Sequence, residues 1–263
     1  MTSSKFNTDD TALSVDLSEA RQAVKESRFK DALELLKIIL ESQPDNIDSL
    51  YLAAVCSRYL KEFDESHKYI EGLLVHAPDM GRAYQELAHL NRDRGNEEKS
   101  VMHYRQAIEL NPALLAPWQA LYKYFKNNNN QPAAEHALQE FNKLNSLPPS
   151  LLYIDQIMNE GRLGIAETKC RAFLKKNPTH TYAMSILAEI ANRLGYFDDA
   201  ELLLEKAVEF KPNDGELRLK YATILRKKQK FAKTMEQVNI LCDQHPDNLS
   251  YQAQKASEVM QNG

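Results

Sequence analysis

Residues 183–215 read AMSILAEIANRLGYFDDAELLLEKAVEFKPNDG. Apolar side chains recur there every three or four residues in two successive segments, which are separated by Gly195 and closed by Pro212. This spacing is typical of two amphipathic helices joined by a short turn. Ala188 in the first segment and Ala200 in the second allow the two helices to approach closely. The stretch therefore predicts one unit of two packed helices.

The same pattern recurs along nearly the whole chain, mostly at a step of 34 residues, which is the mark of a repeat array. Small residues within the first helix are Ala20, Ala54, Ala88, Ala188, Ala222 and Ala256. Small residues that open the second helix are Ala32, Ser66, Ser100, Ala134, Ala166, Ala200 and Thr234. A larger apolar residue follows them at Leu36, Ile70, Leu138, Leu204 and Val238. One unit cannot bury its own apolar face, so neighbouring units must stack.

The ends of the helices also have sequence signals. Prolines that cannot continue the second helix fall at Pro44, Pro78, Pro112, Pro178, Pro212 and Pro246. Glycines that suit the turn between the two helices are Gly95, Gly161 and Gly195. Polar residues just after the prolines are expected to cap the next helix: Asp45, Asp79, Asn213 and Asp247.

This layout resembles the tetratricopeptide repeat family over about residues 13–263. The resemblance implies an all-α fold, a right-handed α-α superhelix with about seven repeats and a truncated eighth first helix. The expected parts are a disordered polar leader (1–12), repeats 1–3 (13–114), a degenerate repeat 4 (115–146), repeats 5–7 (147–248) and one last helix (249–263). In repeat 4, Tyr122 replaces a small residue, and the register slips by two residues before repeat 5. Because the last repeat stops after its first helix, we expect the chain to be a fragment of a longer protein.

Composition limits the classes of partner. The net charge of −4 and the isoelectric point near 6.0 argue against nucleic acid or an anionic membrane as the partner. No apolar run is long enough to span a bilayer. Cys56, Cys170 and Cys242 lie far apart in helical positions, as in proteins of a reducing compartment. We therefore expect a cytoplasmic protein.

The sequence offers little catalytic chemistry. It contains no HExxH, CxxC, GxSxG, GxGxxG or glycine-rich phosphate loop. His89 near Arg92 is the closest approach to a reactive cluster, and a surface histidine is the simpler interpretation. We therefore expect this chain not to be an enzyme, and we expect no catalytic residue, metal or cofactor.

The expected binding surface follows from the resemblance, because first helices line the inner groove in this family. The expected groove residues are Tyr51, Val55, Arg58, Tyr59, Arg82, Gln85, His89, Arg92, Gln119, Lys123, Lys126, Asn192, Arg193 and Arg226. One equivalent position reads Arg58, Arg92, Lys126, Met158, Asn192 and Arg226. Two interpretations stay open: a basic ladder that receives an acidic peptide, or cations that complement helix dipoles. The expected partner is a protein or peptide, including one with acidic segments.

Two segments carry a more specific resemblance. Residues 83–121 and 224–263, with residues 159–178 between them, are similar to the repeat region that precedes the catalytic domain in bacterial tetratricopeptide-repeat sulfotransferases. The resemblance implies a bacterial origin and an alternative function, as the N-terminal region that recruits a partner or substrate for a sulfotransferase. The catalytic domain of that family has no counterpart in this sequence. The positions of the family's chaperone-binding class hold Leu17, Arg21 and Leu52, which do not match that pattern.

Overall fold

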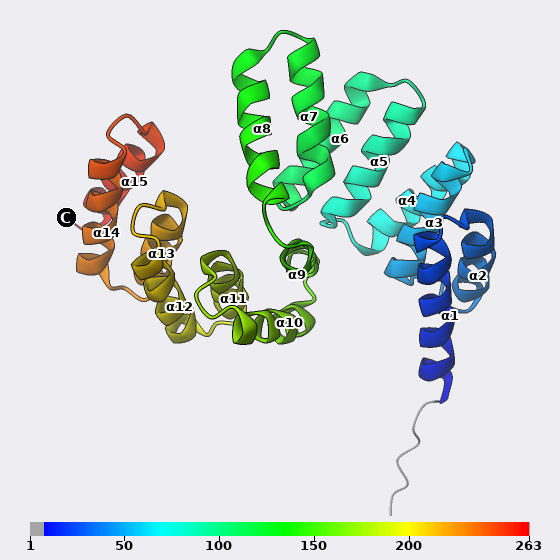
Figure 1. Ribbon diagram of the computed structural model, residues 1–263, viewed down its shortest axis with the longest axis horizontal. Helices are drawn as coiled ribbons and strands as arrows, with labels where there is room; N and C mark the ends of the chain where they lie inside the picture. Colours follow the sequence, from blue (N-terminus) through cyan, green and yellow to red (C-terminus); the bar gives the residue numbers. More distant parts are fainter. Residues whose placement is uncertain (1–7, 263) are drawn as a thin grey trace, which may run out of the picture. The chain divides into compact units, whose positions relative to one another are not determined.

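The computed structural model describes residues 8–262, and side chains from residue 17 to residue 260. Every regular element in this range is an α-helix (Figure 1). The fifteen helices are α1 (Thr8–Lys25), α2 (Phe29–Ser42), α3 (Ile47–Tyr59), α4 (Phe63–His76), α5 (Gly81–Asp93), α6 (Glu97–Leu110), α7 (Leu115–Asn127), α8 (Gln131–Asn145), α9 (Pro149–Asn159), α10 (Leu163–Lys176), α11 (Thr181–Arg193), α12 (Phe197–Phe210), α13 (Gly215–Lys227), α14 (Phe231–Gln244) and α15 (Leu249–Asn262). They form seven successive pairs and one further helix, which confirms the predicted all-α repeat fold.

The helices belong to two compact units, which divide between Leu147 and Pro148. Unit 1 contains α1–α8 and unit 2 contains α9–α15. Within each unit, every helix packs on the next helix along the chain. Each unit has its own buried apolar clusters, such as that around Leu36 and Cys56 in unit 1 and that around Leu204 and Leu225 in unit 2. None of the described helices is long and apolar enough to cross a membrane.

Small residues lie where helices cross, as the periodicity predicts. Ala54 and Ala88 on first helices, and Ala32 and Ala200 on second helices, are completely buried. A longer side chain at these points would push two helix backbones apart. Ala256 on α15 is the exposed exception, and α15 is the last helix among the described residues.

Each pair of helices is joined through one residue with a left-handed backbone. These residues are Ser27, Lys61, Gly95, Asn129, Gly161, Gly195 and Gln229, with φ between 54° and 81°. The conformation lets the residue after the turn bond back to the helix, as in the 2.8 Å bond from the Glu62 amide to the Ser57 carbonyl. Only three of the seven are glycine, so the sequence signal for the turn covers fewer than half of its positions.

The predicted slip in register lies in α8 and α9. Helix α8 has 15 residues and α9 has 11, whereas the other second helices have 14 and first helices α3, α5, α7, α11 and α13 have 13. Pro149 is the first residue of α9, where a missing amide costs no hydrogen bond. Helix α9 begins 34 residues after α7, whereas α10 begins only 32 residues after α8. The extra residue of α8 is offset by a shorter loop after it, so the slip is a loss of two residues from α9.

Two predictions about helix ends need correction. The capping residue lies one position later than predicted: Asn46 accepts from the Ser49 amide at 3.0 Å, and Asp214 accepts from the Leu217 amide at 3.1 Å. The position after the proline belongs to the turn, so its side chain is one residue too far from the helix. Helix α1 begins at Thr8, within the predicted leader of residues 1–12. Residues 1–7 of that leader lie outside the described residues.

Candidate functional site

Arg58, the first member of the predicted basic ladder, is buried. Only 7% of its side chain is exposed, and its Nε donates to Glu86 while its Nη1 donates to Asp93 at 3.0 Å. Glu86 itself is 2% exposed. Arg58 therefore joins α3 to α5 and is not an open cation in a groove. Sequence reasoning placed Arg58 on the side of α3 that faces the expected groove. It could not show which side chains of the next repeat would cover it.

The buried position of this cluster changes how its carboxyls titrate. Burial raises the pKa of Glu86, against the opposing effect of the Arg58 guanidinium. Partial burial acts in the same direction on Asp93, but hydrogen bonds from Arg92 and Arg58 lower the pKa of Asp93 below its usual value. The two carboxyls that share Arg58 thus respond in opposite directions to the same environment.

Aromatic rings hold other predicted groove residues of unit 1. The Arg82 guanidinium lies 4.3 Å from the centre of the Tyr51 ring, and the Arg58 guanidinium lies 4.5 Å from that of Tyr59. Tyr59 also stacks on Phe29 with ring centres 4.4 Å apart and planes nearly parallel. These cation–π and stacking contacts engage the side chains within the unit. Val55 and Gln85 are half-buried beside them.

In unit 2 the equivalent polar residues link consecutive first helices. Arg193 on α11 donates to the Met158 carbonyl on α9 at 3.1 Å and pairs with Glu189 at 2.8 Å. Lys227 on α13 donates to Asn192 on α11 at 2.7 Å. Arg226 on α13 pairs at 3.2 Å with Glu258 on α15. Neither open interpretation of the ladder anticipated these links between repeats.

Four of the predicted groove residues instead meet in one pocket of unit 1. His89, Arg92, Gln119 and Lys123 line a cavity of about 350 Å³ between α5, α6 and α7. In this unit α1 contacts α3, and α3 contacts α5, whereas α5 and α7 approach each other less closely. The pocket occupies that wider interval, and its remaining lining residues are Glu97, Ser100, Val101, Tyr104, Ala116, Ala120, Tyr124 and Asn127.

Tyr104 on α6 is part of the pocket wall, and sequence reasoning missed it. It occupies the position that holds Leu36, Ile70, Leu138, Cys170, Leu204 and Val238 in the other repeats. Its side chain is 2% exposed, so its hydroxyl is a polar group in a core position. That hydroxyl lies 2.6 Å from Nδ1 of His89 and accepts from Nη1 of Arg92 at 3.4 Å. The tyrosine at a position that the other repeats fill with an apolar residue or cysteine was the sequence signal that could have revealed it.

The pair formed by His89 and Tyr104 has a defined protonation state. Burial, helped by the nearby Arg58 and Arg92 charges, lowers the pKa of His89 to about 4. Burial raises the pKa of Tyr104, so its hydroxyl keeps its proton. The hydroxyl and the neutral imidazole are therefore joined by one hydrogen bond, whose donor is set by the tautomer of the ring. His89 thus adds an uncharged ring to the pocket.

Lys123 differs from the other predicted groove cations. Arg58, Arg92, Arg193 and Arg226 have carboxylate partners, and Arg82 and Lys126 lie over tyrosine rings. Lys123 makes no ion pair, hydrogen bond or ring contact with any described residue, and the same holds for Gln119 one turn before it. Both side chains are exposed at the pocket. The pocket therefore presents one uncompensated ammonium beside one free amide.

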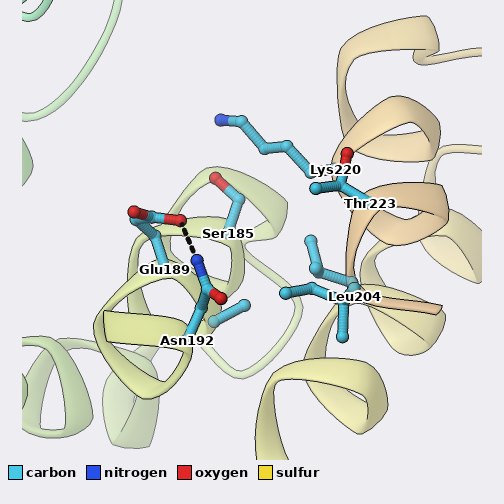
Figure 2. A pocket seen from close by; sticks show the side chains of 8 residues that line it. Ser185, Glu189, Asn192, Leu204, Lys220 and Thr223 are labelled. Carbon is cyan, nitrogen blue, oxygen red and sulfur yellow. Dashed lines mark hydrogen bonds between the residues drawn. The ribbon is translucent and has the colours of Figure 1, made fainter. Parts of the chain in front are cut away.

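A second pocket occupies the equivalent place in unit 2, 100 residues further along the chain. It has about 90 Å³ and lies between α11, α12 and α13 (Figure 2). Glu189 and Asn192 replace His89 and Arg92, Leu204 replaces Tyr104, and Thr223 replaces Lys123. Figure 2 shows Lys220 and Thr223 facing Ser185 and Asn192 across the cavity, above Leu204.

The polar groups around this second pocket are already paired. Asn192 donates to Glu189 at 3.1 Å, and Lys220 pairs with Glu216 at 2.9 Å. It is also much smaller than the pocket of unit 1. Among the described residues, no three His, Cys, Asp or Glu side chains lie where they could hold a metal ion. The pocket between α5 and α7 is thus the strongest candidate site.

Comparison with known families identifies the repeats. Residues 81–114 match the family described as tetratricopeptide repeat, and residues 158–215 match a second model of the same description. The first match covers α5 and α6, which form one side of the candidate pocket, and the second covers α11 and α12. The chain therefore carries tetratricopeptide repeats in both of its units.

Several solved structures match this chain at low sequence identity. One is the structure of Naa15/Naa10 bound to HypK-THB, at 15% identity over 94% of this chain and 39% of the matched chain, with a TM-score of 0.45. A second is the Cut9-Hcn1 heterotetramer of the APC/C, at 14% identity over 97% of this chain and 49% of the matched chain, with a TM-score of 0.43. A third is a thermophilic repeat protein from Thermus thermophilus, at 16% identity over 94% of this chain and 99% of the matched chain, with a TM-score of 0.36. This chain thus spans well under two thirds of the first of these, and scores at this level carry no argument about its function.

Proposed function

We propose that this chain is a scaffold that binds a peptide or polypeptide partner, and that the partner's contact includes the pocket between α5 and α7. The observation that carries the proposal is the unpaired Lys123 and Gln119 beside an open cavity of about 350 Å³. Arg58 in unit 1 and Arg193, Arg226 and Asn192 in unit 2, by contrast, are engaged within their own units. A free donor set over a cavity is the arrangement expected of a surface that a partner completes.

The free charge in this pocket supports a partner with an acidic segment. Lys123 is the one predicted groove cation whose charge no described side chain offsets. An exposed pair between Lys123 and a partner carboxylate would contribute about 1 kcal/mol at most. It would therefore affect the association rate and the orientation of the partner more than its affinity. Apolar contact with Val101, Ala116 and Ala120 would supply the remaining affinity.

The proposal can be tested by capture from a bacterial cytoplasmic extract. The full chain, Lys123→Glu and Lys37→Glu would each be immobilised at low and moderate salt. Lys37 is an exposed lysine on α2, so it matches the charge change at a site far from the pocket in sequence. We expect a partner that the full chain and Lys37→Glu retain and that Lys123→Glu loses. Equal capture by all three chains would contradict the pocket, and no capture would contradict the scaffold.

A second candidate is the recruiting region of a bacterial sulfotransferase, which shares the same cytoplasmic setting. It rests on the resemblance of residues 83–121 and 224–263 to the repeat region of those enzymes. The two candidates differ in genetic context. A gene that also encodes a phosphoadenosine phosphosulfate-binding domain would favour the sulfotransferase, whereas a gene without one would favour the free scaffold.

A further inference from the structure

We infer that the pocket between α5 and α7 is an anchor for one glutamate side chain of the partner. The inference rests on the proposed function and adds the chemistry of the residue that is bound. It follows from three properties of the pocket: the number of free charges, the placement of its donors, and the apolar surface between them.

The charges of the lining disfavour a ligand with a large negative charge. The Arg92 guanidinium donates to Asp93 at 2.9 and 3.0 Å, so its charge is already compensated. Glu97 is a further carboxylate in the lining. Lys123 is then the single free positive charge among the described lining residues. Because Glu97 is in the same lining as Lys123, a monoanion meets less repulsion there than a phosphoryl group, which carries a charge of about −1.5 to −2.

The donors suit the two oxygens of a carboxylate. Gln119 and Lys123 are four residues apart on α7, so their side chains lie on the same face of that helix. The ammonium and the amide can each donate to one oxygen. The neutral His89 on α5 lines the same pocket, with its Nδ1 hydrogen-bonded to Tyr104. Polar side chains of both α5 and α7 thus take part in the lining.

The wall between the donors favours a longer side chain over a shorter one. Val101 on α6 and Ala116 and Ala120 on α7 are apolar parts of the lining. The two methylenes of glutamate can lie along this surface while the carboxylate reaches Lys123. Aspartate has one methylene fewer and would bring its backbone into the cavity. Removing the extra methylene from water favours glutamate over aspartate.

The equivalent pocket of unit 2 supports this specificity by contrast. There Leu219 and Thr223 stand where Gln119 and Lys123 stand, and Glu189 replaces His89. Lys220 stands where Ala120 stands, but it is paired with Glu216. The second pocket thus has a lining carboxylate and a paired lysine where the first has an unpaired lysine, so the proposed anchor is a property of the side chains and not of the repeat.

The test uses peptides as the probe. A positional-scanning library of acetylated, amidated octapeptides is selected on the full chain, and the selected peptides are measured by fluorescence anisotropy with glutamate, glutamine, aspartate or phosphoserine at the enriched position. We expect glutamate to be enriched and glutamine to bind about tenfold more weakly, which corresponds to about 1.4 kcal/mol. Aspartate should bind several-fold more weakly. Lys123→Gln should remove the difference between glutamate and glutamine, and Lys37→Gln should keep it.

The outcomes separate the two levels of the proposal. Selected peptides without glutamate enrichment, or with a preference that Lys123→Gln leaves unchanged, would overturn the glutamate anchor while the scaffold stands. Tighter binding of phosphoserine would also overturn it. If the full chain selects no peptide, both the anchor and the scaffold are refuted. Tyr104→Phe gives a second check, because loss of the hydroxyl frees the His89 ring and should reduce the glutamate preference while the melting temperature shows that the fold is kept.

Discussion

The buried cluster around Arg58 gives the sharpest prediction about stability. In Arg58→Met the guanidinium is lost while Glu86, 2% exposed, stays in the core without its partner. Removing one member of a buried ion pair costs about 3–5 kcal/mol. Burial already raises the pKa of Glu86, so this carboxyl can escape part of the penalty by taking up a proton. We therefore expect unit 1 to lose about 3 kcal/mol of its free energy of unfolding at neutral pH.

The pH dependence of this loss has a definite sign. Without Arg58 the folded-state pKa of Glu86 rises further above its unfolded value, because the opposing positive charge is gone. A carboxyl with a raised pKa favours folding at low pH, and that contribution is lost as pH rises through the folded-state pKa. The deficit of Arg58→Met should therefore shrink as the pH is lowered from about 8 to about 5.

Trp118 allows this prediction to be measured in the right unit. It is the single tryptophan of the chain, it lies on α7 in unit 1, and only 8% of it is exposed. Urea unfolding followed by its fluorescence reports the local transition. Lys68→Met is the control, because Lys68 pairs with Glu65 at the surface and its loss should leave the midpoint unchanged. The reasoning is refuted if Arg58→Met unfolds at the wild-type midpoint, and Arg58→Met/Glu86→Leu should recover much of the loss.

Three further predictions concern the turns, the core and the pocket. Lys61→Gly should raise the free energy of unfolding by about 0.5–1 kcal/mol, because Lys61 has φ 64° and glycine adopts this region without strain; a lower urea midpoint would contradict it. Ala200→Leu should lower it by about 1–3 kcal/mol, since Ala200 is fully buried, and an unchanged circular-dichroism transition would show that Ala200 is not at a helix crossing. The His89 ring should titrate by NMR near pH 4. Stability should then fall from pH 6.5 toward 4, as only the unfolded chain takes up the proton; a midpoint near 6.5 would exclude the buried neutral ring.

The arrangement of helices could be predicted from sequence because it depends on residues that repeat. Ala54 and Ala88 are both fully buried, and most repeats have an alanine at the equivalent position. A pattern that recurs many times averages out the exceptions. The left-handed turns could be predicted only in part, because Ser27 and Lys61 have a positive φ, which their residue types do not indicate.

The candidate site was harder to predict because it depends on contacts between repeats. Sequence reasoning placed His89, Arg92, Gln119 and Lys123 on the face that forms the pocket. It could not show that Arg58 would be buried by Glu86, which lies 28 residues away on another helix. Such a pair forms only where a long side chain extends across the interface between two helices. The repeat pattern does not show how far each side chain extends. Whether the predicted groove residues bind a partner stays a prediction.

The equivalence of the two pockets has a consequence for how such a chain can change its specificity. Trp118 and Arg218, again 100 residues apart, each donate to the carbonyl of the preceding turn proline, at 2.8 and 2.7 Å. The helices thus accommodate very different side chains at the same position of the repeat. The side chains at the pocket position can therefore differ between repeats while the helices that position them stay the same. The two units of this chain hold two different versions of one pocket.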